Sequence, residues 1–156
     1  PLANVDTMTR AIEIVEIDTV DTHDLRRSLL RDGTLTDQVE FDGDDDDSTF
    51  HLGATADGTL VAISTWMNRR YPDLPGHPGH QLRGMATAPA ARGTGISDRL
   101  LVAGLGRCGD VGSTLVWARA RVAALSFYER HGFTTKGHEY VDLTTGLPHH
   151  DIVTYL

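Results

Sequence analysis

The segment MATAPAARGTGISDRLL, residues 85–101, most constrains the fold, because it runs from a strand through a glycine-rich turn into a helix. The strand-like pattern ends at Thr87, and Pro89 breaks the strand. The run that follows predicts a helix that starts near Ile96 or Ser97. Glycines at the mouth of a helix cost backbone entropy, so a pair of them at this place calls for a physical reason.

The turn before this helix has the residue types of a site for a diphosphate. The first amides of a helix lack partners within the helix and lie at the positive end of its dipole. Gly93 and Gly95 have no side chains that would keep an anion away from those amides, and Arg92 adds a positive charge. The residue types alone also allow a simpler interpretation, in which the glycines only let the chain bend.

Two other phosphate-binding motifs can be checked against the sequence. The Walker pattern GxxxxGK[ST] is absent. The pattern GxGxxG occurs at Gly104, Gly106 and Gly109, but a helical run precedes it and a strand follows, whereas a dinucleotide site has the opposite order. We interpret GRCGDVG, residues 106–112, as the end of a helix and a turn.

The remaining patterns predict a mixed α/β sheet. Alternation over residues 11–17 indicates a first strand, and a helical run follows it. Two strand-like runs flank Asp57 and Gly58, a dipeptide that is typical of hairpins. Further strands are expected at 81–87, at 113–120 and in the segments HEYVDL and HDIVTYL, with a helix over VAALSFYERHG. The element order is therefore β-α-β-β-β-α-β-α-β-β.

Length and composition agree with one globular domain over residues 1–156. The hydrophobic fraction is 40%, and a chain of this length can bury a substantial core without cross-links. Cys108 is the only cysteine, which excludes an internal disulfide and suits a reducing compartment. The sequence has no apolar run that would span a membrane, and its N-terminus lacks the pattern of a signal peptide. We expect a cytoplasmic protein.

The formal net charge of −8 argues against a nucleic-acid partner, because phosphate contacts need clustered Lys and Arg. It leaves a cationic amine as a plausible substrate. Four consecutive aspartates, Asp44–Asp47, are interpreted as a solvated loop. The alternative is that this run lies near an amine-binding cleft and attracts cations.

The glycine-rich turn resembles motif A of the GNAT superfamily of N-acetyltransferases, whose pattern is [RQ]-x-x-G-x-[GA] between a strand and a helix. Arg92 and Gly95 match the first two fixed positions, and Ser97 stands where the family has Gly or Ala. A second segment, AALSFYERHGF, is similar to the family pattern A-x-x-[FL]-Y-x-x-x-G-F. Its matching residues are Ala124, Tyr128, Gly132 and Phe133.

The ending GLPHHDIVTYL resembles the tail G-P-H-x-x-M of one bacterial subgroup, with Pro148 and His149 matching and Ile152 in place of Met. The order and separation of the motifs also fit, and the resemblance covers residues 10–156. It implies a GNAT-like acyl-CoA N-acyltransferase fold of the α/β class. Such a fold has a central, mostly antiparallel sheet that is splayed between two strands and flanked by helices.

The resemblance implies that acetyl-CoA is the cosubstrate and that its acetyl group moves to an amine. It places the diphosphate on the glycine-rich turn and the pantetheine arm on the strand before it, with the Met85 amide polarising the thioester oxygen. Tyr128 takes the place of the family's general acid, which protonates the departing thiolate; otherwise it is a core residue with its hydroxyl on backbone. The expected cofactor-binding residues are Met85, Ala86, Thr87, Arg92, Gly93, Thr94, Gly95, Ile96, Ser97 and Arg121.

Some roles stay open in the sequence. Arg119 and Arg121 lie where many family members have an asparagine; each can reach a CoA phosphate or face solvent, and Arg121 is taken as the CoA contact. His149 is named as the general base, since histidine accepts a proton near neutral pH. The alternatives are Glu139, His138, His80 and a water chain. The histidine pairs have no recognised zinc spacing, so no metal is expected.

The expected function is acetyl transfer from acetyl-CoA to a primary amine of a small molecule. The alternatives are a protein or peptide amine as acceptor, and a module that binds acyl-CoA without catalysis. Neither a nucleic acid nor a membrane is expected as a partner, and a homodimer is left open.

Overall fold

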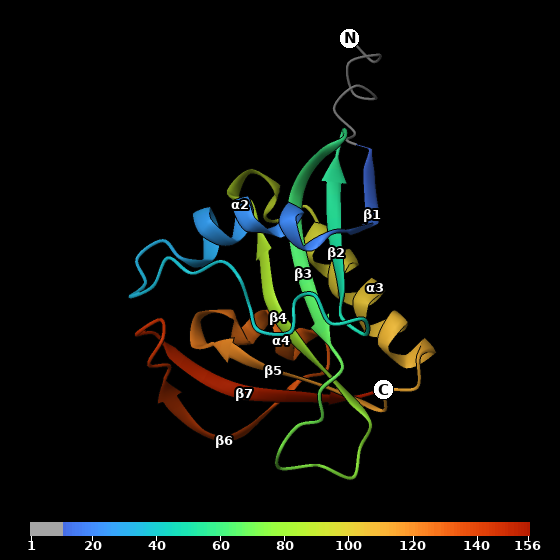
Figure 1. Cartoon of the computed structure of the whole chain (residues 1–156), viewed down its shortest axis with the longest axis vertical. Helices are drawn as coiled ribbons and strands as arrows, with labels where there is room; N and C mark the ends of the chain where they lie inside the picture. Colours follow the sequence, from blue (N-terminus) through green and yellow to red (C-terminus); the bar gives the residue numbers. More distant parts are fainter. Residues whose placement is uncertain (1–10) are drawn as a thin grey trace.

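The computed structural model describes residues 11–156, which form a seven-stranded sheet with helices on both faces (Figure 1). The strand order is β1-β2-β3-β4-β5-β7-β6, and among the described strands only β4 and β5 pair in parallel. The predicted mixed, mostly antiparallel sheet is thus confirmed. The strands are β1 (Ile12–Ile17), β2 (Phe50–Ala56), β3 (Thr59–Met67), β4 (Gly79–Thr87), β5 (Leu115–Arg121), β6 (Thr134–Val141) and β7 (Pro148–Tyr155).

Two long helical segments cover opposite faces of β2–β4: α3 (Ile96–Asp110) lies behind the sheet in Figure 1, and the segment 19–30 lies in front. The segment 19–30 consists of a 3₁₀ turn (Thr19–Thr22), α2 (His23–Leu25) and a π-helical turn (Arg26–Leu30). The sequence predicts a single regular helix here, and the structure has three short helical turns of different types in succession. The short α4 (Leu125–Arg130) follows β5 through a 3₁₀ turn (Val122–Ala124), and another 3₁₀ turn (Pro89–Ala91) follows β4.

The predicted hairpin between β2 and β3 is confirmed. Asp57 and Gly58 have φ angles of 51° and 82°, so both residues of the two-residue turn are left-handed. This geometry matches the twist of the flanking strands, and it explains why Asp-Gly occupies the turn. The first ten residues of the chain, over which we expected no signal peptide, lie outside the described residues. Within the described part, no helix is both long and apolar enough to cross a membrane.

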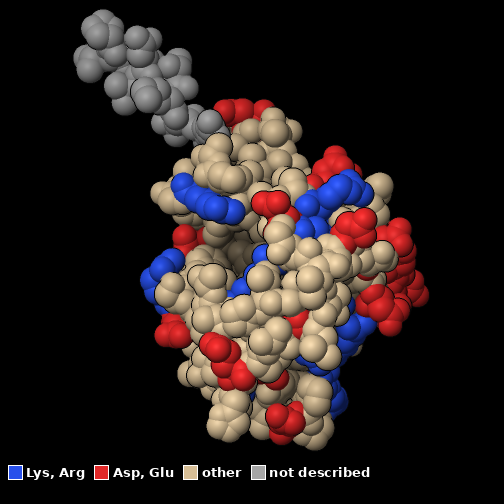
Figure 2. Space-filling view, turned by 90° about the vertical axis from the view of Figure 1, so that its left-hand side faces the viewer, with Lys and Arg blue, Asp and Glu red and all other residues tan. Residues whose placement is uncertain are grey.

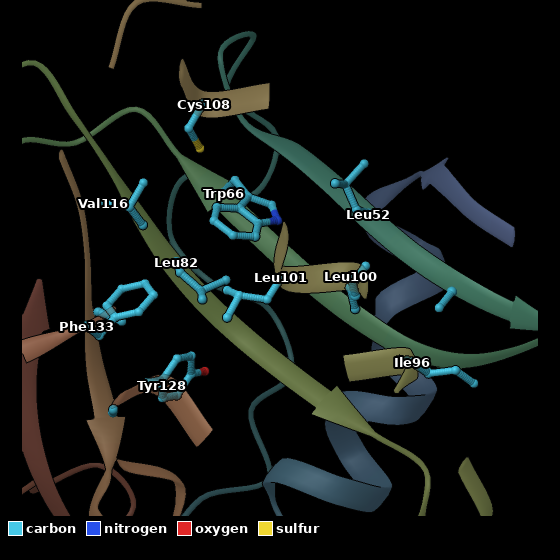
Figure 3. Packing of buried hydrophobic residues seen from close by; sticks show 14 of the residues in the cluster. Leu52, Trp66, Leu82, Ile96, Leu100, Leu101, Cys108, Val116, Tyr128 and Phe133 are labelled. Carbon is cyan, nitrogen blue, oxygen red and sulfur yellow. The ribbon is translucent and has the colours of Figure 1, made fainter. Parts of the chain in front are cut away.

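The main core lies between α3 and the sheet (Figure 3). Trp66 of β3 is fully buried there, and its indole N–H donates to Ser64 Oγ at 2.9 Å. Cys108 is also fully buried, and burial raises the pKa of its thiol to about 12. α3 continues through Gly104 and Gly106 and ends at Asp110, and residues 111 and 112 form a turn, so the predicted helix end and turn within residues 106–112 are confirmed. A Cβ at Gly104 would lie 1.8 Å from Trp66 Cζ2, so this glycine is needed for close packing of α3 on the sheet.

The strands β4 and β5 part in the middle of the sheet. Their pairing runs from Gly79–Leu115 to Leu82–Ala118 and then stops, although β4 continues to Thr87 and β5 to Arg121. Figure 1 shows β4 rising while β5 turns away from it. The splayed sheet that the family resemblance implied is therefore present, and it opens a space between two central strands.

A buried ion pair holds the segment 31–49 against the front of the sheet. Arg26 is fully buried, and its guanidinium donates to both carboxylate oxygens of Asp44 at 2.7 and 2.9 Å. Arg26 also donates to Thr65 Oγ1 of β3, and Asp44 accepts a hydrogen bond from the Phe41 amide. The solvated-loop interpretation of Asp44–Asp47 is therefore wrong for Asp44, because Arg26 takes it into the interior, and right for Asp45, Asp46 and Asp47, which are exposed.

We predict opposite effects of alanine at two glycines of α3. Gly104→Ala drives a methyl group into Trp66, so the free energy of unfolding falls by about 1–3 kcal/mol. Gly106→Ala serves as the control, because Gly106 is exposed and has open space around it; there alanine favours the helix and raises the free energy of unfolding by up to about 1 kcal/mol. Urea unfolding measures both. Equal effects of the two substitutions would contradict the packing role of Gly104.

We predict that Asp44→Asn lowers the free energy of unfolding at pH 7 by about 3–5 kcal/mol, because it leaves the Arg26 guanidinium buried without an anion. Asp47→Asn, in the same acidic run, changes an exposed side chain and shifts the value by less than about 0.5 kcal/mol. Urea unfolding of both variants checks the difference.

The same pair gives a pH dependence. Burial alone would raise the pKa of Asp44, but the hydrogen bonds from Arg26 and the Phe41 amide, with the charge of Arg26, lower it overall. The stabilisation is therefore complete above the unfolded pKa of about 3.9 and is lost as pH falls through the lower folded pKa. The difference between wild type and Asp44→Asn should shrink as pH falls through that folded pKa. A constant difference over pH 7 to 3 would contradict this account.

Candidate active site

A cavity of 360 Å³ lies where β4 and β5 part. Figure 2 shows it as a hollow with blue arginine or lysine atoms at its edge. One wall comes from β4 and β5, and the others come from the segment 30–41, from α4 and from the β6–β7 connection. Its lining includes Leu30, Arg31, Phe41, Arg69, Gln81, Leu82, Arg83, Gly84, Met85, Ala118, Arg119, Ala120, Arg121, Ala124, Tyr128, Asp142, Thr144, Thr145 and His149.

A bulge in β4 shapes the base of this cavity. Arg83 pairs with Thr65, and Ala86 pairs with Ile63. Between these two pairs β4 has two residues and β3 has one, so β4 contains one extra residue. The extra residue lies at Gly84–Met85, where Gly84 has a φ of 59° and a Cβ would lie 2.8 Å from Phe41 Cε2. Glycine thus allows both the bulge and the approach of the Phe41 ring.

The bulge and the splay together leave the backbone at Met85 outside both ladders. Gly84 and Met85 have no recorded partner in β3, and the pairing with β5 has already ended at Leu82. Ala86 and Thr87 pair again with β3, on the side of β4 away from β5. The expected pantetheine strand therefore has a free backbone edge that faces the opening, with Met85 in the cavity wall.

Tyr128 lies at the border between the core and the cavity. Its ring packs against Phe133, with ring centroids 5.4 Å apart, and Figure 3 shows the two side by side. Burial raises the pKa of the Tyr128 phenol above its usual value of about 10. Within residues 11–156 its hydroxyl has no hydrogen-bond partner, unlike Tyr71 and Tyr140, which both donate to Asp151. The alternative in which a backbone group holds this hydroxyl therefore finds no support.

His149 of β7 lies in the same cavity wall, opposite Arg121 of β5 in the sheet register. Its Nδ1 lies 2.9 Å from the carbonyl oxygen of Leu147, which can only accept. Nδ1 therefore carries the proton, and in the neutral ring Nε2 is the atom that can accept one. Asp142, also in the lining, accepts hydrogen bonds from the amide and the hydroxyl of Thr145 at 2.9 Å each.

The other candidate bases lie elsewhere. His80 is buried at the start of β4, where its Nδ1 lies 2.5 Å from Ser113 Oγ and burial lowers its pKa. His138 and Glu139 are exposed on β6, and none of these three residues lines the cavity. In the described part of the chain, no three His, Cys, Asp or Glu side chains come together in a way that would hold a metal ion.

The glycine-rich turn has the geometry of an open amide cradle. Gly93 and Gly95 have φ angles of 74° and 82°, which are left-handed, and Gly95 is the residue before the first turn of α3. A Cβ at either glycine would meet nothing within 4 Å, so the space above the turn is empty. Within residues 11–156, the backbone amides from Gly93 to Asp98 have no acceptor; the first amide that has one is that of Arg99, 3.1 Å from Gly95 O.

The side chains around the cradle brace it and do not fill it. Arg92 is exposed, and its Nε donates to Thr87 O at 3.2 Å, which leaves its terminal nitrogens free. Ser97 Oγ lies 2.6 Å from Thr87 Oγ1 and joins α3 to the end of β4, and Thr94 Oγ1 donates to Ala91 O. Ile96 is buried in the core, so only its amide can face a ligand.

The structure places Arg121 in the cavity wall, where its Nη2 donates to the carbonyl oxygen of Leu30. None of the residues 92–97 lines this cavity, so Arg121 and the cradle belong to different parts of the site. The lining also includes Arg31, Phe41, Arg69 and Arg83, which belong to none of the sequence motifs. A signal for Arg83 exists in QLRGM and WARAR, because charged or amide side chains at alternate positions of central strands mark a polar face.

Comparison with known proteins agrees with this architecture. Residues 35–153 match the sequence profile described as Acetyltransferase (GNAT) domain. The chain is 28% identical over 129 residues to YitI of Bacillus subtilis (strain 168), called an uncharacterized N-acetyltransferase; the match covers 83% of this chain and 87% of YitI.

Solved structures share the fold at low identity. FeeM, an N-acyl amino acid synthase from uncultured soil microbes, superposes with a TM-score of 0.78 at 14% identity, over 94% of this chain and 92% of FeeM. ElaA of Escherichia coli superposes with a TM-score of 0.73 at 19% identity, over 92% of this chain and 99% of ElaA. With the profile spanning most of its length, the chain belongs to the GNAT family of acyl-CoA-dependent N-acetyltransferases.

Proposed function

We propose that this acetyltransferase, acting as one domain in the cytoplasm, moves the acetyl group of acetyl-CoA to a primary amine of a small molecule. The observation that carries the proposal is the alignment of three parts along one path. The amide cradle at 93–98 fits a diphosphate, the free backbone edge at Met85–Thr87 fits a pantetheine arm, and the cavity with Tyr128 and His149 fits the reacting groups. A peptide with a mobile amine is the alternative acceptor, since its terminus would enter the same cavity.

The residues present have the chemistry that the cofactor would need. Acetyl-CoA supplies the thioester. The cradle, with Arg92 at its edge, would bind the diphosphate of acetyl-CoA through backbone amides that have no partner within residues 11–156. The positive end of the α3 dipole lies at the same place. The role of Arg121 as a CoA contact stays a prediction, and its position in the cavity wall favours a role near the reacting groups instead.

The chemistry forms one bond and breaks another. The neutral amine nitrogen attacks the acetyl carbonyl, the new C–N amide bond forms, and the C–S bond breaks. The Met85 amide would stabilise the oxyanion that develops on the carbonyl. The amine proton would pass to His149 Nε2, directly or through water, and the Tyr128 hydroxyl would give its proton to the leaving thiolate. The raised pKa of Tyr128 keeps that proton in place at neutral pH.

A first test concerns the cradle. Gly95→Ala adds a methyl group to the empty space where the diphosphate would lie, so the affinity for CoA should fall by about 10- to 100-fold, the effect of losing a charge-assisted hydrogen bond. Gly58→Ala is the matched control, because Gly58 has the same φ of 82°, the same open surroundings and a place in the β2–β3 turn. Both variants lose about 1–2 kcal/mol of stability to the left-handed backbone.

Isothermal titration calorimetry with CoA measures the outcome. Weaker binding in Gly95→Ala alone supports the cradle. Unchanged affinity in a folded Gly95→Ala protein would place the CoA diphosphate elsewhere.

A second test concerns the proton donor. Tyr128→Phe should keep CoA binding and slow acetyl transfer by about 100-fold, because the thiolate then leaves without a proton donor. Tyr155→Phe is the control, since Tyr155 is exposed at the end of β7 and lies outside the cavity. Release of free thiol under single-turnover conditions measures the rate. Wild-type rates in Tyr128→Phe would assign the proton to another group.

A further inference from the structure

The cavity is strongly basic although the protein is acidic. Its lining holds a single carboxylate, that of Asp142, against the guanidinium groups of five arginines. These arginines come from four separate parts of the chain: the helical segment end, the β3–β4 connection, β4 and β5. They are Arg31, Arg69, Arg83, Arg119 and Arg121.

None of the five forms an ion pair with a carboxylate within residues 11–156. Arg31 donates to the carbonyl oxygen of Gln38 at 2.5 Å, and Arg69 donates to that of Asp42 at 2.7 Å. Such neutral acceptors orient a guanidinium but do not neutralise it. The one lining carboxylate, that of Asp142, accepts hydrogen bonds from the amide and hydroxyl of Thr145 through Oδ2, and its charge acts on Arg31 and Arg121 without a direct ion pair.

Arg83 and Arg119 are the freest of these side chains. In the described chain neither donates a hydrogen bond to any protein group, although each guanidinium has five N–H donors. Arg83 Cζ lies 4.4 Å from the centroid of the Phe41 ring, and Arg119 Cζ lies 5.8 Å from that of Trp117. The aromatic rings fix where the two guanidinium groups lie and leave their donors available to a ligand.

The energetics of the cluster favour an anion. Burial, and then the charge of Arg69, lower the pKa of Arg83 to about 10; the charge of Asp44 opposes this shift, and those of Arg26 and Arg119 add to it. Arg83 therefore stays charged at neutral pH, under repulsion from its neighbouring arginines. Burial, followed by the charges of Arg121 and Arg26, also lowers the pKa of Arg31, and the charge of Asp142 opposes this shift only in part. An oxyanion in the cavity would relieve this repulsion and accept the unused donors.

The arginine cluster is separate from the cradle that would hold the CoA diphosphate. The amide cradle for the diphosphate lies at residues 93–98, and no residue from 92 to 97 lines the cavity. The arginines line the same cavity as Tyr128 and His149. This is the space that the acceptor amine must enter.

We propose that the acceptor is a small anionic amine, whose carboxylate or phosphate group is held by Arg83 and Arg119 while its amino group faces Met85 and Tyr128. This inference rests on the proposed acetyl transfer and names its substrate class. It replaces the cationic acceptor that the net charge suggested. The aspartates that favoured a cation lie outside the cavity lining, and Asp44 is bound to Arg26.

The test compares amines that differ in charge, using the full chain with saturating acetyl-CoA and measuring released thiol. Glycine is compared with glycinamide, aspartate with its diamide and phosphoethanolamine with ethanolamine; spermidine represents cationic amines. We expect the anionic member of at least one pair to exceed its neutral counterpart by about 10- to 100-fold in kcat/KM. The carboxylate and phosphate pairs distinguish the two sources of the oxyanion. The amine of an amino acid amide is less basic than that of the amino acid, so a larger fraction of it is neutral and reactive at neutral pH. In the first two pairs this difference favours the amide, which is opposite to the expected result.

Variants connect the preference to the cluster. Arg83→Gln and Arg119→Gln should each remove most of the preference for the anion and leave the affinity for CoA unchanged. Arg27→Gln is the control, because Arg27 is exposed on the π-helical turn and outside the cavity. Faster transfer to spermidine or to the neutral members would overturn the anionic assignment while supporting acetyl transfer.

A binding measurement separates this inference from the proposed function. Succinate and inorganic phosphate are titrated into the CoA-saturated protein by calorimetry. We expect saturable binding of at least one anion, weakened about 10- to 100-fold in Arg83→Gln and Arg119→Gln but not in Arg27→Gln. Binding of this kind without transfer to any amine of the panel would support the anion site and count against the proposed transfer. Absence of binding for both anions in the wild type, together with no preference for anionic amines, would overturn the inference.

Discussion

The end of hydrogen bonding between β4 and β5 is the constraint on which the rest of the structure depends. Two central strands that part leave backbone N–H and C=O groups without partners, and such groups need partners when they are buried. Beyond Leu82 and Ala118 the pairing cannot resume, because the bulge at Gly84–Met85 bends β4 away. The gap is thus a place where a ligand can complete the sheet, and the elements around it are arranged to shape that gap and not to close it.

The front wall of the gap shows how charge and packing act together. Arg26 stacks on Phe41 with its Cζ 3.8 Å from the ring centroid, while Arg83 contacts the same ring from the cavity side. One of these arginines is neutralised by Asp44 and serves the fold; the other has no anion and is available to a ligand. A single aromatic ring therefore contacts both an arginine of the structural ion pair and an arginine of the cavity lining, with Gly84 making room for the ring.

Features that depend on neighbouring residues were predictable from the sequence. The turn at Asp57–Gly58, the cradle glycines and the order of elements along the chain follow from local backbone preferences and from two family motifs. The basic cavity was not predictable, because its arginines come from distant segments and meet only when the sheet forms. The net charge, which suggested a cationic substrate, gives no information about the charge of one cavity, since it sums over the surface and the interior. The packing role of Gly104 was not predictable, because glycine is needed there to make room for Trp66, which lies 38 residues away in the chain.

The burial of Cys108 has a practical consequence for work with this protein. The side chain lies on the buried face of α3, within the core, and a thiol whose pKa is raised to about 12 is almost entirely protonated at neutral pH. Thiolates, and not thiols, react with disulfide and maleimide reagents. Cys108 of the folded protein should therefore not react in a chromogenic thiol assay, so that the signal reports released CoA alone. The same residue becomes reactive when α3 lifts from the sheet, which makes its labelling rate a reporter of opening of the core.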